Sequence, residues 1–189
     1  EALEAICSTH KINSVLEIGA GVGICGVAAQ KMNITDFTFL DTSPKVCEHV
    51  RANLPYPVTQ KNAFDYNFWR DGFDGDVVLM GMPYEHNPHF LLRKGHGVSC
   101  SCDYVVFQSG CTAFFEFEHD WLLGNKNFHD WPWWRPEQTI PHHFTNYLEM
   151  SLEWQTCVVA TRKKHDLAPL KKEMERRGFT EIKYEKIEI

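Results

Sequence analysis

The first hundred residues alternate between short apolar runs and segments with helical spacing of apolar positions. Each apolar run is bounded by glycine, proline or polar residues, which is typical of short buried strands. Strands are predicted at residues 14–18, 37–40, 58–60, 76–80 and 103–108. Strands that alternate with helices indicate a doubly wound, mostly parallel α/β sheet in three layers, with right-handed connections.

Two helices are predicted between the first three strands. The first follows a glycine cluster and runs through Gly26 to about Met32. In the second, Ser43 is a capping residue, Pro44 suits the first turn, and apolar positions recur every four residues up to Leu54. The prolines that follow Leu54 end this helix, because proline cannot continue the hydrogen-bond pattern.

A regular pattern returns near the end of the chain. It predicts a strand at 154–161 and a helix at 166–177, with Gly178 as the C-terminal stop. A last strand is predicted at 179–189, with a bulge where its alternation changes phase. Because a helix separates these strands, a second arrangement stays open. In it, the strand at 154–161 takes the fifth place in the sheet and 103–108 belongs to an insertion.

Residues 112–150 have no regular periodicity and are rich in aromatic residues, histidine and proline. Four of the six tryptophans lie there, at positions 121, 131, 133 and 134. We interpret this segment as a lid or substrate-binding insertion within a single domain that spans residues 1–189. The alternative is a hydrophobic wrap over a sheet edge, since aromatic side chains mainly bury surface area.

The overall composition is that of an ordinary globular domain. The 189 residues include 43% hydrophobic and 23% charged residues, which argues against widespread disorder. The net charge of −6 indicates no basic face for duplex DNA, and no apolar run is long enough to cross a membrane. The sequence starts at Glu1 without a secretory signal, so we expect a cytoplasmic protein and a larger parent chain.

The seven cysteines are expected to be mostly reduced thiols, because their number is odd and no secretory signal is present. A metal site would need histidine and cysteine at familiar spacings. The only cluster is His96, Cys100, Cys102, Cys111 and His119, whose spacing matches no familiar zinc finger. We therefore expect no metal.

The strongest candidate for chemistry is the turn after the first predicted strand. Residues 17–23 read E-I-G-A-G-V-G, and they join the strand to the following helix. Glycines in such a turn let a ligand approach the backbone closely. Asp41, at the end of the next strand, can accept hydrogen bonds from two ribose hydroxyls. The pair predicts a nucleotide-cofactor site, and dinucleotide-binding proteins also use this pairing.

Two details distinguish this turn from the dinucleotide fingerprint. The glycines run G-x-G-x-G instead of G-x-G-x-x-G, and Glu17 lies two residues before the first glycine. The stretch resembles motif I of the class I S-adenosylmethionine-dependent methyltransferases, which is an acid, any residue and then G-x-G-x-G. S-adenosylmethionine has an ammonium but no pyrophosphate, so its site needs an acid more than a helix dipole aimed at phosphate.

The resemblance covers about residues 14–108 and implies S-adenosylmethionine as the cofactor. It places Glu17 and Gly19 at the methionine part of the cofactor, with Ala20 in the same turn. It makes Gly21 and Gly23 the residues that shape the loop.

For the nucleoside part, the resemblance implies contacts from three further strand ends. Asp41 would hold the ribose hydroxyls, and Thr42 would lie beside the adenine. Asn62-Ala63 stands where the family often has Asp-Ala against the adenine amino group, with Asp65 as a substitute candidate. Met80, at the end of the fourth strand, completes the expected cofactor-binding set.

Residues after the fourth strand lie beside the methyl group in this fold, which makes Tyr84, Glu85 and His86 the catalytic candidates. Tyr84 would pack against the acceptor or donate a hydrogen bond to it, and Glu85 or His86 would take its proton. The alternative makes the tyrosine a wall of the site and the other two residues part of a solvated loop.

The choice of acceptor depends on the same stretch. Residues 17–29 resemble the seven-strand protein lysine methyltransferases, which carry Asp-x-x-Tyr after strand four, but residues 80–84 read M-G-M-P-Y without the acid. The Asn-Pro-Pro-Tyr motif of methyltransferases that act on planar amines is matched only at Pro83-Tyr84. We expect a nitrogen or oxygen acceptor on a protein or RNA. A small-molecule acceptor and a non-catalytic binding module are the alternatives.

Overall fold

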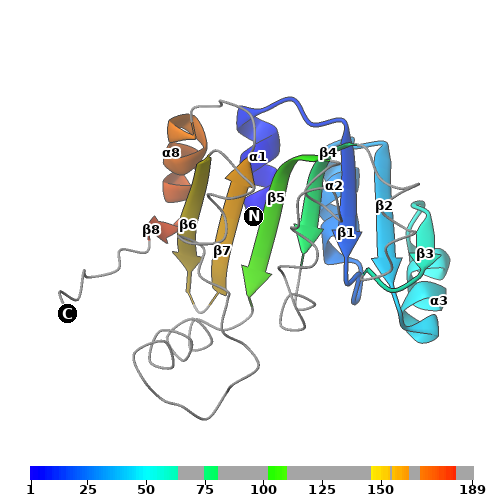
Figure 1. Cartoon of the computed structure of the whole chain (residues 1–189). Helices are drawn as coiled ribbons and strands as arrows, with labels where there is room; N and C mark the ends of the chain where they lie inside the picture. The colour runs from blue at the N-terminus through cyan, green and yellow to red at the C-terminus, as the bar shows by residue number, and fades with distance from the viewer. Residues whose placement is uncertain (64–74, 81–101, 110–145, 154, 162–166, 182–189) are drawn as a thin grey trace, which may run out of the picture.

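The structure, a computed structural model of the whole chain, describes residues 1–63, 75–80, 102–109, 146–153, 155–161 and 167–181. These residues form an eight-stranded mixed sheet in the order β3-β2-β1-β4-β5-β7-β6-β8 (Figure 1). The strands are β1 (Ser14–Ile18), β2 (Asp36–Asp41), β3 (Val58–Gln60), β4 (Gly75–Met80), β5 (Cys102–Ser109), β6 (Asn146–Leu152), β7 (Gln155–Thr161) and β8 (Thr180–Glu181). The helices in the described part are α1 (Ala2–Thr9), α2 (Ile24–Lys31), α3 (Pro44–Asn53) and α8 (Ala168–Arg176).

The strands predicted in the first part of the chain are confirmed, and they pair in parallel as β1 to β5. β1 lies between β2 and β4, so the strand order reverses at β1. Ile18 pairs with Leu40 of β2 and with Met80 of β4, which places the carboxyl ends of these strands at one edge of the sheet. Open α/β sheets bind ligands outside the carboxyl ends of the strands at such a reversal.

The antiparallel end of the sheet decides the order of the last strands. β7 pairs antiparallel with β5 on one side and with β6 on the other, and β8 pairs antiparallel with β6. Because β5 pairs in parallel with β4, residues 102–109 hold the fifth place in the sheet. The arrangement in which 154–161 takes that place and 103–108 belongs to an insertion is therefore wrong.

Strand β6 was not expected, because it begins inside the segment interpreted as an irregular insertion. Its apolar residues Leu148, Met150 and Leu152 alternate, and Met150 is fully buried. This alternation is the sequence signal for a half-buried strand. Residues 146–150 thus belong to the sheet. The rest of the segment, 112–145, lies outside the described residues, and its role as a lid stays a prediction.

The helix predicted at 166–177 is confirmed as α8, and Gly178 follows it with a φ of 92°. The left-handed backbone at this position is the usual way in which a glycine ends a helix. Of the strand predicted at 179–189, the described residues contain β8. Positions 182–189, which include the expected bulge, lie outside them.

Helix α3 begins as its sequence predicts. The Oγ of Ser43 accepts a hydrogen bond from the backbone N–H of Val46 at 3.4 Å, and Pro44 occupies the first helical turn. These features satisfy one of the unpaired amides at the helix start. The helix thereby leaves the end of β2 in a defined direction, with Asp41 directly before it.

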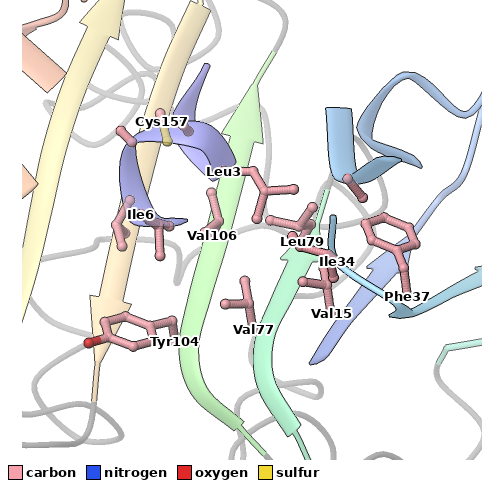
Figure 2. Packing of buried hydrophobic residues seen from close by; sticks show 14 of the residues in the cluster. Leu3, Ile6, Val15, Ile34, Phe37, Val77, Leu79, Tyr104, Val106 and Cys157 are labelled. Carbon is pink, nitrogen blue, oxygen red and sulfur yellow. The ribbon is translucent and has the colours of Figure 1, made fainter. Parts of the chain in front are cut away.

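Helix α1 was not predicted, although its apolar residues recur at helical spacing. Ala2, Leu3, Ala5 and Ile6 are all buried. Figure 2 shows α1 lying across β5 and β7, with Leu3 and Ile6 among the buried side chains of the sheet. The helix packs against α8, and Arg177 after α8 forms ion pairs with both Glu1 and Glu4 at 3.0 Å.

Both faces of the sheet are buried. One face carries a hydrophobic cluster to which all four helices in the described part contribute, together with Val15, Val77 and Val106 (Figure 2). On the opposite face, Leu16 and Val105 are almost completely buried as well. Burial on both faces is typical of a parallel sheet in a layered α/β protein. None of the described helices combines the length and apolar character that a membrane span requires.

Candidate functional site

The turn between β1 and α2 has the backbone that its glycines predict. Gly19, Gly21 and Gly23 have φ angles of 80°, 53° and 79°, in the left-handed region that side chains disfavour. The Gly19 N–H donates to the carbonyl of Leu40 at 2.8 Å, and the Gly23 N–H donates to the carbonyl of Ala20 at 2.8 Å. The turn is therefore tight, and it is tied to the end of β2.

The glycines of this region differ in what surrounds them. A Cβ at Gly21 would meet no atom within 4 Å, so this side of the turn is open. A Cβ at Gly23 would lie 2.5 Å from Cδ1 of Leu54, and one at Gly26 would lie 2.5 Å from Cζ of Phe39. Gly23 and Gly26 thus allow close packing of α2 against its neighbours, whereas Gly21 leaves the backbone accessible to a ligand.

Glu17 lies in β1 directly before this turn, and its side chain is buried with 8% exposed. Its Oε2 is buried and has no hydrogen-bond partner among the described residues. Burial raises the pKa of this carboxyl to about 8; the nearby Cys25 thiol acts to lower the pKa, and the charge of Asp41 acts to raise it. A buried oxygen without a partner is costly, so it marks a position that suits a donor supplied from outside the chain.

Asp41 closes β2 at the same edge of the sheet. Its Oδ1 accepts a hydrogen bond from the Ser43 N–H at 2.8 Å, and its backbone carbonyl accepts one from the Lys61 N–H at 3.1 Å. Within the described part of the chain, no hydrogen bond involves Oδ2. The carboxylate is thereby held in one orientation, with its second oxygen available to a hydroxyl donor.

The other predicted cofactor residues follow the same strand ends. Thr42 is exposed directly after β2, while Asn62 is exposed and Ala63 is buried shortly after β3. Ala20 in the turn is 3% exposed, and Met80 at the end of β4 is 1% exposed. The fold therefore brings all the predicted cofactor residues to the carboxyl edge of four neighbouring strands. The substitute candidate Asp65 and the catalytic candidates Tyr84, Glu85 and His86 lie outside the described residues.

Cys25 is a site residue that the sequence analysis did not identify. It is the second residue of α2, and its thiol and the Glu17 carboxyl each shift the pKa of the other. Burial raises the pKa of its thiol, and the Glu17 charge raises it further. The sequence signal was its place at the start of the helix, two residues after Gly23, from which a side chain can turn back toward the strand.

The described residues contain no group of three or more His, Cys, Asp or Glu side chains arranged to hold a metal ion. Of the cysteine and histidine cluster considered in the sequence, Cys102 is buried in β5, and its other members lie outside the described residues. No disulfide bond is formed by the cysteines within the described ranges, namely Cys7, Cys25, Cys47, Cys102 and Cys157.

Solved methyltransferase structures are similar to this chain over most of its length. The ribosomal protein L11 methylase from Lactobacillus delbrueckii subsp. bulgaricus has a TM-score of 0.56 and 14% identity, with 86% of this chain and 77% of that chain covered. An O-methyltransferase family protein from Burkholderia thailandensis has a TM-score of 0.56 and 15% identity. There the match covers 82% of this chain but 52% of that chain, so this chain spans about half of that protein.

A third similar structure contains the cofactor product. TrmK of M. capricolum, in complex with S-adenosylhomocysteine, has a TM-score of 0.53 and 12% identity, with 87% of this chain and 68% of that chain covered. No family model and no curated protein sequence matches the chain. The structural similarities establish the fold, which is that of the class I S-adenosylmethionine-dependent methyltransferases.

Proposed function

We propose that the chain is a methyltransferase that binds S-adenosylmethionine at the turn between β1 and α2. The observation that carries the proposal is the buried Oε2 of Glu17, which has no partner in the described part of the chain and stands on the strand that leads into the open turn at Gly21. A ligand that fits this place brings a cationic donor and lies close to the backbone. The amino-acid part of S-adenosylmethionine has both properties.

The nucleoside part of the cofactor fits the neighbouring strand ends. We assign the ribose hydroxyls to Oδ2 of Asp41, because Oδ1 is already engaged by Ser43. Charge-assisted hydrogen bonds of this kind are stronger than neutral ones. We assign the adenine to Thr42 and Asn62-Ala63, and Met80 to the floor of the site. TrmK, which has a similar fold, binds S-adenosylhomocysteine, and this supports S-adenosylmethionine as the cofactor.

Methyl transfer is an in-line displacement at a carbon that the sulfonium of S-adenosylmethionine already activates, and this is the chemistry that the cofactor supplies. The chain's own residues then have to bind the cofactor and the acceptor, align them for the transfer and exclude water from the site. We assign contact with the acceptor to Tyr84 and removal of its proton to Glu85 or His86. This assignment follows from their place after β4, which ends beside β1 at the proposed site.

We propose a nitrogen or oxygen acceptor on a protein or RNA. The name of the similar ribosomal protein L11 methylase supports a protein acceptor. The free thiols in the described part suit a reducing compartment, and we therefore place the protein in the cytoplasm.

The test combines cofactor binding with methyl transfer. Calorimetry with S-adenosylhomocysteine should show saturable binding to one site. Incubation with S-adenosylmethionine labelled in the methyl group should then label a protein or an RNA fraction, and the Glu17→Gln variant should label it much less at a subsaturating cofactor concentration. Label that appears only in small molecules would show that the acceptor is a small molecule and not a protein or RNA. Binding without transfer would indicate a non-catalytic binding module. Absence of binding would refute the proposal.

A further inference from the structure

Glu17 is an acidic residue in apolar surroundings. It is 8% exposed, and its Oε2 is buried without a hydrogen-bond partner among the described residues. In the parallel sheet, Glu17 is in register with Phe39 of β2 and Leu79 of β4, and both of these residues are buried. Its neighbours across the sheet are therefore hydrocarbon side chains, which do not solvate a charge.

No positive charge balances this carboxyl group in the described part of the chain. The ion pairs found there do not include Glu17. The titratable groups that act on it are Cys25 on α2 and Asp41 on β2, neither of which is a cation, and β4 places the apolar Leu79 beside it. A buried carboxylate without a partner is costly, so such a group holds a proton instead. In agreement, burial raises the pKa of Glu17 to about 8.

We propose that cofactor binding is coupled to proton release at Glu17: the ligand-free protein holds this carboxyl neutral, and the ammonium of the cofactor's amino-acid part displaces its proton. The proposal rests on the proposed function, since it takes that site as the place where the cofactor binds, and it adds control by pH. On binding, the O–H bond of the carboxyl breaks and the proton goes to the solvent. The carboxylate then accepts a hydrogen bond from the ammonium, which keeps its own charge.

The exchange is favourable because the ligand supplies the charge that the site lacks. An opposite charge within hydrogen-bond distance stabilises the ionised form of a carboxyl group, and a paired buried charge costs much less than a single one. The carboxylate of the ligand's amino-acid part keeps the neighbouring ammonium charged in the same way. S-adenosylmethionine and S-adenosylhomocysteine share this amino-acid part, so both should release the proton. 5′-Methylthioadenosine has the nucleoside and the sulfur but no ammonium, so it should leave Glu17 neutral.

The coupling fixes the sign of the pH dependence. Protons compete with the ammonium for the Glu17 carboxyl, so affinity for S-adenosylhomocysteine should fall as the pH drops below the pKa of about 8 and level off above it. From pH 6 to pH 7 the affinity should rise by about five- to tenfold, because about one proton is displaced for each ligand bound. Over the same range the affinity for 5′-methylthioadenosine should stay nearly constant.

The experiment is calorimetric titration of the full chain with both ligands between about pH 6 and 8.5, in two buffers of different ionisation enthalpy. The difference in heat between the buffers gives the number of protons released. We expect release with S-adenosylhomocysteine and none with 5′-methylthioadenosine. Glu17→Gln has nearly the same shape but cannot ionise, so it should bind S-adenosylhomocysteine without proton release and with an affinity that is nearly independent of pH. The gap between wild type and variant should therefore widen as the pH rises.

Asp76→Asn is the matched control, because Asp76 carries a carboxyl group at the other end of β1, where Asn13 and Ser14 donate hydrogen bonds to it. It should follow the wild-type profile, and circular dichroism checks that both variants are folded. The comparison of the two ligands needs no variant, so it decides the question even where Glu17→Gln does not fold.

The possible failures are distinguishable. Wild-type protein that binds S-adenosylhomocysteine without proton release, at an affinity independent of pH, would overturn the coupling and leave the proposed function standing. Release that persists in Glu17→Gln, or that accompanies 5′-methylthioadenosine equally, would overturn it as well, because the proton would come from another group. A wild-type protein that binds no S-adenosylhomocysteine would refute the proposed function, and this inference with it.

Discussion

The two ends of strand β1 differ in the hydrogen bonding of a carboxyl group. At the amino end, Oδ2 of Asp76 in β4 accepts hydrogen bonds from the backbone N–H groups of Asn13 and Ser14, at 2.6 and 3.2 Å. The Asn13 side chain adds a third at 3.3 Å, and Ser14 Oγ accepts from the Asp76 N–H at 2.9 Å. At the carboxyl end, Oε2 of Glu17 is buried and no described residue forms a hydrogen bond with it.

The difference separates a structural role from a binding role. At the amino end, Oδ2 of Asp76 is engaged by hydrogen bonds that join β4 to the start of β1. The carboxyl end combines an open glycine turn with a buried oxygen that has no partner in the described part of the chain, and this unpaired oxygen costs free energy in the absence of a ligand. Substitutions at the amino end should therefore change stability, and those at Glu17 and Asp41 should change binding.

The largest expected effect is a loss of stability in Gly23→Ala, and comparison with Gly21→Ala tests whether both glycines at the carboxyl end serve binding. Gly23→Ala should lower the free energy of unfolding by about 2–4 kcal/mol, because the new Cβ would crowd Leu54 and the residue would keep a left-handed backbone. Gly21→Ala should cost about 1–2 kcal/mol, for the backbone conformation alone, while weakening cofactor binding. Urea unfolding measures both variants. Equal destabilisation would contradict the different surroundings of the two glycines.

Glu17→Gln should weaken S-adenosylhomocysteine binding by roughly 10- to 100-fold, because a charged hydrogen bond is lost. Its effect on stability depends on pH. The pKa of Glu17 is raised from 4.5 to about 8 in the folded protein, so the folded state binds more protons than the unfolded state between these values. Wild-type stability attributable to this group is therefore lost as pH rises from about 4.5 through about 8, and Glu17→Gln should remove that dependence. Thermal unfolding at pH 5.5 and 8 checks the sign.

Asp41→Ala should weaken S-adenosylhomocysteine binding by at least about tenfold, through loss of charge-assisted hydrogen bonds to the ribose. Asp41 also accepts a hydrogen bond from Ser43 at the start of α3, so Asp41→Ala can disturb the local structure as well. Asp41→Asn is therefore the second variant to measure. It keeps an oxygen that accepts from the Ser43 N–H but removes the charge. Calorimetry that finds wild-type affinity in both variants would exclude Asp41 from the binding site.

The smallest effect is expected at the amino end. Asp76→Ala should lower the free energy of unfolding by about 1–2 kcal/mol, because the N–H groups of Asn13 and Ser14 lose their acceptor. Affinity for S-adenosylhomocysteine should stay within about twofold of the wild type. Asp76→Asn, which retains a carbonyl acceptor, should lose less stability. Strongly impaired binding in a folded Asp76→Ala variant would show that the two ends are coupled.

Local sequence determined the parallel part of the fold and the candidate site. Short apolar runs between turn residues specify the strands β1 to β5, since burial of both faces requires apolar residues at successive positions. The spacing of Glu17, the glycines and Asp41 specifies the turn and the neighbouring strand end, since only glycine adopts these φ angles without strain. Each of these features depends on residues that are close together in the chain.

Tertiary structure alone decided which atoms at that edge are available. Leu54 is distant from Gly23 in sequence, and only their contact distinguishes Gly23 from the open Gly21. The unpaired Oε2 of Glu17 follows from the burial of its side chain within the described part of the fold. The order of β5, β7 and β6 was likewise decided by pairing between distant segments. Packing and hydrogen bonding between distant residues are collective, and no local pattern of apolar and polar positions contains them.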